Sequence, residues 1–81
     1  MWFVYILESK EFGKYYIGCT DNIERRLSEH NSGKTISIRK YIPYELIYFE
    51  KFEKQNNAFN REKQIKKYKG GKAFKKLIEK I

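Results

Sequence analysis

Hydrophobic and polar residues follow two different periods along this chain of 81 residues. Apolar and aromatic residues dominate positions 2–7 and 14–18, with Gly13 in the connection, which is the pattern of a two-stranded hairpin. A third run, rich in β-branched and aromatic residues, covers positions 44–49 directly after Pro43. We expect these three segments to form a three-stranded, mainly antiparallel sheet.

Helical signals appear between the second and third strands. We expect a first helix at positions 22–31, opened by a capping box of Asp21 and Glu24 and ended by Gly33. Ser, Thr, Asp or Asn followed three residues later by Glu is a common helix start, and glycine is a common residue just past a helix end. The sheet is therefore interrupted by one helix before its third strand.

The C-terminal part of the chain predicts two more helices. The first begins at an N-cap of Asn56 or Asn57 and reaches about Lys69, before Gly70 and Gly71 break it. The second has an apolar stripe spaced i, i+3, i+4 and i+7, formed by Phe74, Leu77, Ile78 and Ile81. The predicted order is β-β-α-β-α-α, an α+β fold in a single domain that spans residues 1–81.

The composition favours one ordered domain. Hydrophobic residues make up 41% of the chain, and seven Tyr and six Phe supply core volume despite 35% charged residues. The apolar N-terminal run is short and has no basic leader, which argues against a signal peptide or a membrane span. The lone Cys19 excludes an intramolecular disulfide and a cysteine-rich zinc site. We therefore expect a monomeric protein of the reducing cytoplasm.

The net charge of +8 is concentrated near the C-terminus. Residues 55–81 hold nine Lys and Arg against two Glu, whereas residues 1–54 hold nine against eight acidic residues. This asymmetry favours a polyanionic partner, although a basic face that only confers solubility would give the same count. The cations that we expect to contact a phosphate backbone are Lys34, Arg39, Lys40 and Lys66.

Two polar residues share the inner side of the predicted first helix. At about 100° per residue, His30 falls within about 20° of Ile23, which lies on the apolar stripe, and Arg26 falls about 60° to one side. Both side chains are therefore predicted to face inward. The planar guanidinium of Arg26 suits two phosphate oxygens, and a histidine can bind phosphate or transfer a proton near neutral pH.

Glu62 is also set into an apolar surface. It lies one turn from Ala58 and Phe59 on one side and from Ile65 on the other, inside the apolar stripe of the second predicted helix. An unpaired buried carboxylate is strongly destabilising, so a metal ion, a cation or a shifted pKa has to accompany it. Together with Arg26 and His30, this residue suggests a phosphodiester-cleaving site.

Five positions together resemble the GIY-YIG nuclease family. Residues 3–5 read Phe-Val-Tyr and residues 16–18 read Tyr-Ile-Gly, with ten residues between them, which is similar to the family's pair of motifs. Arg26, His30 and Glu62 then follow in the family's order. The resemblance covers nearly the whole chain and is strongest to small single-domain bacterial members, which are similar to the GIY-YIG nuclease module of bacterial excinuclease.

The resemblance implies a β-β-α-β-α-α domain that acts as a metal-dependent endonuclease on DNA, with branched or damaged structures as candidate substrates. It implies one Mg²⁺ or Mn²⁺ ion held by Glu62, and a phosphate clamp at Arg26. Tyr5 and Tyr16 would flank the attacking water, and His30 would assist proton transfer or bind phosphate. The domain would contact the DNA backbone, with a partner protein as one source of specificity.

Blander interpretations of the same residues stay open. Tyr5 could serve packing alone, because it alternates with apolar neighbours on one strand face. His30 could be a cation at a helix C-terminus, where it would interact favourably with the helix dipole. Arg26 and Glu62 could form a structural ion pair with each other.

Three departures from the family's pattern leave a second function open. Phe3 stands where the first motif has Gly, Cys19 stands where some members have Lys, and no Asn follows Glu62. A catalytically silent nucleic-acid-binding module of the same fold would fit the missing Asn. A small RNA-associated or ribosome-associated basic protein would explain the charge and leave Glu62 unexplained.

Overall fold

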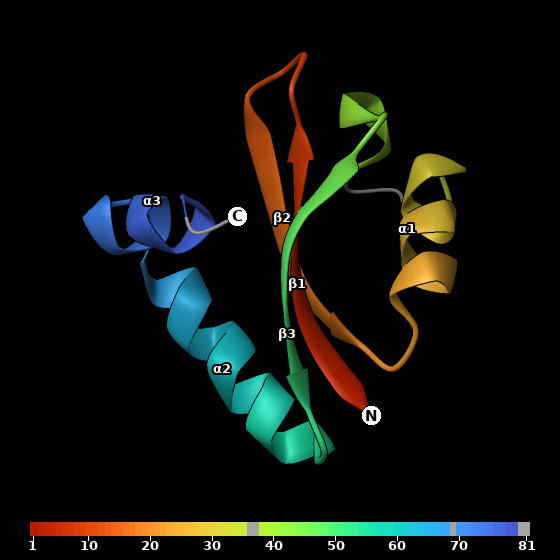
Figure 1. Ribbon diagram of the computed structural model, residues 1–81. Coiled ribbons are helices and arrows are strands. Elements are labelled where there is room, and N and C mark those ends of the chain that lie inside the picture. Colours follow the sequence, from red (N-terminus) through yellow and green to blue (C-terminus); the bar gives the residue numbers. More distant parts are fainter. Residues whose placement is uncertain (36–37, 69, 80–81) are drawn as a thin grey trace.

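The computed structural model describes residues 1–35, 38–68 and 70–79 (Figure 1). Its elements follow the predicted order β-β-α-β-α-α, with one short 3₁₀ helix before the third strand that the sequence pattern did not predict. None of the described helices is long and apolar enough to cross a membrane. The elements are β1 (Trp2–Ser9), β2 (Lys14–Thr20), α1 (Ile23–Asn31), η1 (Arg39–Tyr41), β3 (Glu45–Phe52), α2 (Gln55–Lys67) and α3 (Lys72–Ile78).

The three strands form one antiparallel sheet in the order β2-β1-β3, as the hairpin and the third run predicted. Gly13 lies in the turn of the hairpin with a φ of 63°, a backbone conformation that glycine adopts without strain. Each strand continues past its predicted end, for example to Thr20 in β2 and Phe52 in β3. Cross-strand pairing, which a single segment does not reveal, extends them.

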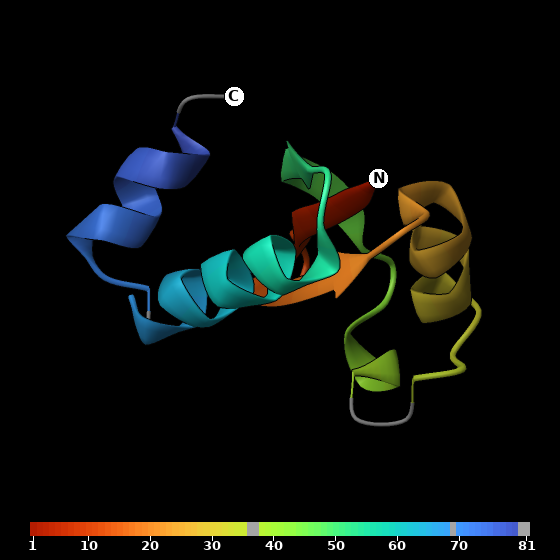
Figure 2. The ribbon, with the colours of Figure 1, turned by 90° about the horizontal axis from the view of Figure 1, so that it is seen from below.

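The sheet separates two layers of helices (Figures 1 and 2). α2 and α3 cover one face, and α1 and η1 lie on the other. Successive residues of a strand point to opposite faces, so Val4 and Ile6 of β1 face α2, whereas Tyr5 and Leu7 face α1. The alternation along β1 thus assigns its residues to two different clusters.

The α2 face holds the larger hydrophobic core. Its strand and α2 members are fully buried, and α3 closes it with Phe74 and Leu77. The stripe predicted for the last helix is confirmed for Phe74, Leu77 and Ile78, while Ile81 lies outside the described residues. The fully buried members of this core are Val4, Ile6, Ala58 and Ile65.

The start of α1 corrects the predicted capping box. Asn22 caps the helix, because its side-chain oxygen accepts a hydrogen bond from the backbone N–H of Arg25 at 3.0 Å. Asp21 instead forms an ion pair with the Arg25 guanidinium at 2.9 Å. The predicted end is confirmed: Gly33 has a φ of 83°, and its N–H donates to the carbonyl of His30.

The start of α2 was also predicted incorrectly. The helix begins at Gln55 after an N-cap of Lys54 whose side chain makes no capping hydrogen bond, so Asn56 and Asn57 lie inside the helix. β3 ends only at Phe52, and the chain turns directly from the strand into the helix. The end of the sheet therefore fixes this start. Lys69, the predicted end of α2, lies outside the described residues.

Candidate functional site

The site begins on the α1 face of the sheet, where β1 and β2 lie side by side. Tyr5 is the cross-strand partner of Gly18, and Tyr16 lies two residues before Gly18 on the same face. The neighbouring Tyr15 points to the opposite face, where its ring packs edge-on against Phe74 of α3 at a centroid distance of 5.1 Å. Tyr16 is thus the member of that adjacent tyrosine pair that reaches the site.

Gly18 allows the Tyr5 ring to lie directly against β2. A Cβ atom on Gly18 would lie 2.6 Å from Cζ of Tyr5 and 3.1 Å from Cε1 of Tyr16. Both distances are well inside the optimal separation of about 3.5–4.0 Å between carbon atoms. The glycine therefore has a steric role, because any side chain at this position would displace the Tyr5 phenol.

Tyr5 and His30 form a buried polar pair between the sheet and α1. The Oη atom of Tyr5 and Nε2 of His30 are 3.1 Å apart, and Tyr5 is only 2% exposed while His30 is fully buried. Nδ1 of His30 has no hydrogen-bond partner among the described residues. Buried polar atoms in proteins usually have a hydrogen-bond partner, so this nitrogen is unusual.

Tyr16 completes a cluster of three rings. Its ring centroid lies 4.6 Å from that of His30 and 6.2 Å from that of Tyr5. Unlike Tyr5, Tyr16 is only half-buried, so it lies at the solvent edge of the cluster. The two predicted tyrosines therefore lie side by side, one enclosed and one accessible.

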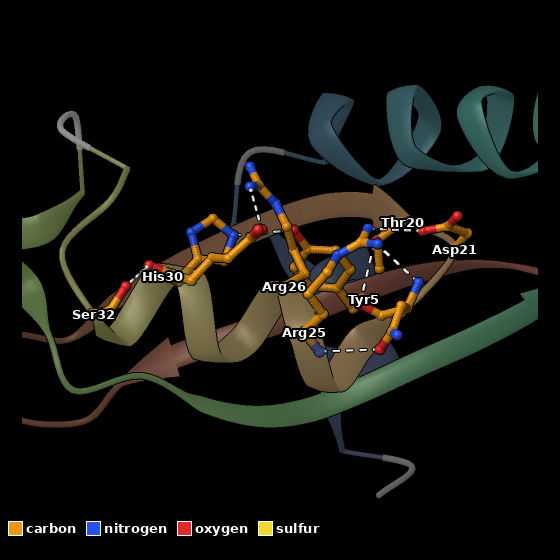
Figure 3. Close-up of polar contacts among 9 residues, drawn as sticks. Tyr5, Thr20, Asp21, Arg25, Arg26, His30 and Ser32 are labelled. Atoms are coloured by element: carbon orange, nitrogen blue, oxygen red, sulfur yellow. Dashed lines mark hydrogen bonds and ion pairs between the residues drawn. The ribbon is translucent and has the colours of Figure 1, made fainter.

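Arg26 lies one turn before His30 on α1 and points to the same cluster (Figure 3). Its guanidinium donates to Oε1 of Glu29 at 3.2 Å, and its side chain is 34% exposed. Burial disfavours the charged form of Arg26, but interactions with Tyr5, Glu29 and Tyr16 outweigh this and raise its pKa. A permanent positive charge therefore lies beside both phenols.

The burial of Tyr5 and His30 shifts the pKa of both groups. Burial raises the pKa of the Tyr5 phenol to about 12, although Arg26 acts in the opposite direction. Burial, with the nearby Arg26 charge, lowers the pKa of His30 below its ordinary value. Burial thus favours the uncharged form of both groups, which argues against the interpretation of His30 as a helix-terminal cation.

Glu62 lies in the other layer, on α2. Its side chain is 18% exposed and pairs with Lys66, one turn on, at 2.7 Å. Burial raises the pKa of the Cys19 thiol to about 11, and the Glu62 charge adds to this shift. The same charge contributes in a smaller way, after burial, to the raised pKa of Tyr5. The carboxylate therefore lies within electrostatic range of both β1 and β2.

These contacts exclude a mutual ion pair of Arg26 and Glu62. Arg26 pairs with Glu29 on its own helix, and Glu62 pairs with Lys66 on its own helix. Lys66 therefore supplies the partner that the Glu62 carboxylate needs on an apolar helix face. Four predicted site residues, Tyr5, Tyr16, Arg26 and His30, form one group, and Glu62 approaches this group from α2.

The other predicted cations lie outside the group of site residues. Lys34, Arg39 and Lys40 are exposed in the segment between α1 and β3. The ammonium of Lys40 lies over the ring of Tyr41, 5.1 Å from its centroid. Lys66 differs from these three because it contacts Glu62 directly.

One residue that positions the site was missed by sequence reasoning. Asn31 follows His30 and appeared to belong only to the end of the helix. Its side chain accepts a hydrogen bond from the N–H of Tyr44 at 2.7 Å and donates to the carbonyl of Tyr44 at 3.0 Å. These two hydrogen bonds join the end of α1 to the chain entering β3. The only sequence feature that could have indicated this role is the side-chain amide of Asn31 directly after His30.

The sequence matches one protein-family model, described as the GIY-YIG catalytic domain, over residues 1–76. Curated relatives are UPF0213 proteins of bacteria and archaea. The chain is 40% identical over 68 residues to the one from Streptococcus pneumoniae serotype 4, covering 83% of this chain and 68% of that protein. It is 35% identical over 80 residues to the one from Staphylococcus saprophyticus, covering 95% and 94% of the two chains.

A solved structure has the same fold. The solution NMR structure of a UPF0213 protein from Bacillus halodurans is similar with a TM-score of 0.60 and 31% sequence identity. The match covers 98% of this chain and 84% of that one. The similarity therefore includes the sheet, both helix layers and the segments that carry all five predicted site residues.

Proposed function

The chain belongs to the GIY-YIG catalytic-domain family, and we propose that it is a metal-dependent endonuclease that hydrolyses phosphodiester bonds of DNA. The observation that carries this proposal is the contact group of Tyr5, Tyr16, Arg26 and His30, which gathers a fixed cation and a buried proton-accepting pair. Phosphodiester hydrolysis needs charge stabilisation at the phosphate and a path for the proton of the attacking water.

Arg26 is proposed to bind the scissile phosphate. Its guanidinium can contact two phosphate oxygens, and its charge persists at every physiological pH. Glu29 holds it on one side while the other side faces the tyrosines. The charge that develops on the phosphate in the transition state would then be met by a cation already in place.

Tyr5 and His30 are proposed to transfer the proton. With a pKa of about 12, Tyr5 does not ionise by itself at neutral pH. It can accept a proton from the attacking water while its own proton passes to Nε2 of His30, which is 3.1 Å away and uncharged. The water oxygen forms the new bond to phosphorus as the bond to the leaving oxygen breaks, and the leaving oxygen takes a proton from solvent.

Glu62 is the proposed metal ligand, and the residues fit a magnesium-type ion. Among the described residues, no three His, Cys, Asp or Glu side chains lie close enough together to hold a metal ion, which argues against zinc-like ligation. One carboxylate plus water and substrate phosphate is a normal Mg²⁺ environment. The Lys66 ammonium beside Glu62 is half-exposed, so it can move away from the carboxylate. When bound, the ion would stabilise charge on the phosphate.

The charge of the chain supports backbone binding without base-specific recognition. Lys34, Arg39 and Lys40 are exposed between α1 and β3, and seven of the eight net positive charges come from residues 55–81, where nine Lys and Arg face two Glu. Such cations contact phosphates and carry little sequence information. We infer that preference comes from DNA structure, as in repair or recombination intermediates, or from a partner protein. A monomeric cytoplasmic protein would suit this role.

A catalytically silent nucleic-acid-binding module is the second candidate. Two observations favour it: no Asn follows Glu62 in the sequence, and Glu62 already pairs with a lysine. In this alternative Arg26 and the basic segments bind phosphate, and the ion pair on α2 is permanent. Binding would then be independent of divalent metal.

One experiment separates the two. Wild type, Glu62→Ala and a control, Glu53→Gln, are incubated with plain, nicked, flapped and four-way-junction DNA in Mg²⁺, Mn²⁺ or EDTA. Glu53 is an exposed carboxylate in the turn before α2. If the protein is an endonuclease, wild type and Glu53→Gln should cut DNA in a metal-dependent way. Glu62→Ala should bind DNA without cutting it. Binding without cutting in all three proteins would establish the silent module.

A further inference from the structure

An exposed aromatic pair lies next to the proposed phosphate site. Phe49 of β3 is the cross-strand partner of Tyr5 on the α1 face, and it is 53% exposed. Phe3 packs edge-on against it, with ring centroids 6.1 Å apart and an interplanar angle of 66°. Opposed residues on neighbouring strands have Cβ atoms about 4.5–5.5 Å apart, so this aromatic surface begins directly beside Tyr5.

The charges of the sheet make this face suitable for a polyanion. The three strand carboxylates, Glu8, Glu45 and Glu50, belong to the register positions that face α2 and α3. The two strand lysines, Lys14 and Lys51, belong to positions on the α1 face. Within the sheet, the aromatic pair therefore shares its face with lysines and not with carboxylates, and Arg26 of α1 adds a cation that is paired with Glu29. Aromatic rings on a face with these cations are complementary to a nucleic acid strand.

We propose that Phe49, braced by Phe3, stacks on an unpaired nucleobase adjacent to the phosphate bound at Arg26. The inference deepens the proposed function and rests on it for the position of that phosphate. A base inside a continuous duplex already stacks on its neighbours and does not offer its face to a protein ring. The site therefore selects strands with unpaired nucleotides, such as flaps and single-stranded segments, over intact duplex.

Phe59 supplies a matched control. It is a second phenylalanine of similar exposure, at 42%, with a similar edge-on neighbour, Trp2, at 6.1 Å. It lies on α2, in the opposite layer of the fold from α1. Phe59→Ala removes an exposed phenyl ring of similar exposure to that of Phe49 without changing the surface beside Tyr5.

The test measures binding in EDTA, so that turnover does not enter the result. Fluorescence anisotropy is recorded for an oligothymidylate of about 12 nucleotides, an abasic strand of equal length and charge, and a blunt duplex. The proteins are wild type, Phe49→Ala, Phe49→Trp and Phe59→Ala. Sedimentation of each protein without DNA shows whether the aromatic surface joins two copies of the chain instead.

The proposal expects Phe49→Ala to bind oligothymidylate about five- to a hundredfold more weakly than wild type, which is the usual loss for one stacked base. Phe49→Trp and Phe59→Ala should bind oligothymidylate with wild-type affinity. The wild-type protein should bind the abasic strand more weakly than oligothymidylate by a similar factor. Equal affinity of wild type for the oligothymidylate and abasic strands would overturn the proposal. So would a wild-type dimer that dissociates in Phe49→Ala.

The outcomes also distinguish this inference from the proposed function. Equal wild-type affinity for the oligothymidylate and abasic strands, together with metal-dependent cutting, would overturn the inference and leave the endonuclease intact. Retained stacking without cutting on any substrate would support the inference for the binding module and overturn the endonuclease.

Discussion

The two faces of the sheet bury different kinds of residues. The face under α2 and α3 buries aliphatic side chains such as Val4, Ile6 and Ile65. The face under α1 buries Tyr5, Leu7 and Tyr44, together with the imidazole of His30. Burying polar groups stabilises a fold less than burying hydrocarbon, because each must find a partner. The α2 face therefore contributes most of the stability, and the α1 face carries most of the candidate chemistry.

The α2 face also fixes the helix that carries Glu62. Arg61, its neighbour on α2, donates from Nε and Nη2 to both carboxylate oxygens of Glu50 on β3, at distances of 2.9 Å and above. Tyr48 donates to the same carboxylate. Hydrogen bonds with Glu50 raise the pKa of Arg61 further above its already high value. This bidentate pair holds α2 at one rotation on the sheet, and so positions Glu62.

The largest expected effect tests the core. Ile65→Ala should lower the free energy of unfolding by about 2–5 kcal/mol, because Ile65 is fully buried between α2 and the sheet. Leu27→Ala, at a half-buried position on α1, should lower the free energy of unfolding by less than about 2 kcal/mol. Urea denaturation followed by circular dichroism measures both. Equal losses would contradict the assignment of stability to the α2 face.

Gly18→Ala should destabilise the protein by about 1–3 kcal/mol, because the new Cβ overlaps the Tyr5 ring. The displaced phenol would also lose its contact with His30, so cutting should fall more than stability suggests. Gly13→Ala is the control: it has a strained φ of 63° but no atom within 4 Å of the new Cβ. Cutting by Gly18→Ala at the wild-type rate would show that the Tyr5 position is not needed.

Arg61→Met should cost about 1–2 kcal/mol, since the ion pair with Glu50 is mostly but not fully enclosed, each side chain being 23% exposed. A double-mutant cycle with Glu50→Gln measures the coupling. In contrast, Arg25→Met breaks the exposed pair with Asp21 and should cost less than about 1 kcal/mol. Absence of coupling between Arg61 and Glu50 would remove the bidentate pair as the anchor of α2.

The smallest expected effect is the pH dependence at His30. Burial lowers its pKa in the folded protein, whereas the unfolded chain takes up a proton near pH 6.5, about the ordinary value. The unfolded state thus binds more protons in the window below pH 6.5, and the free energy of unfolding falls as the pH drops through it. His30→Gln should lack this slope. The rate of cutting should fall only at still lower pH, where the imidazole of the folded protein takes up a proton itself and can no longer accept one.

Local sequence patterns predicted the order of the strands and α-helices and the faces on which Tyr5 and His30 lie. The alternation of Tyr5 with its strand neighbours and the angular position of His30 relative to Ile23 placed both side chains correctly on inner faces. The stop at Gly33 was equally local, because a positive φ depends on one residue. The starts of α1 and α2 were not predictable from capping signals alone, since the ends of β2 and β3 decide where each helix can begin.

The order of strands and α-helices, the family motifs and the excess of cations near the C-terminus can all be read from the sequence. Three features come from the packing of distant segments: Tyr5 contacts His30, 25 residues away, Glu62 pairs with Lys66 and not with Arg26, and Phe49 is exposed beside Tyr5. Periodicity specifies which side of an element a residue occupies. The register of the sheet and the packing of α1 and α2 on its two faces specify which of those residues meet.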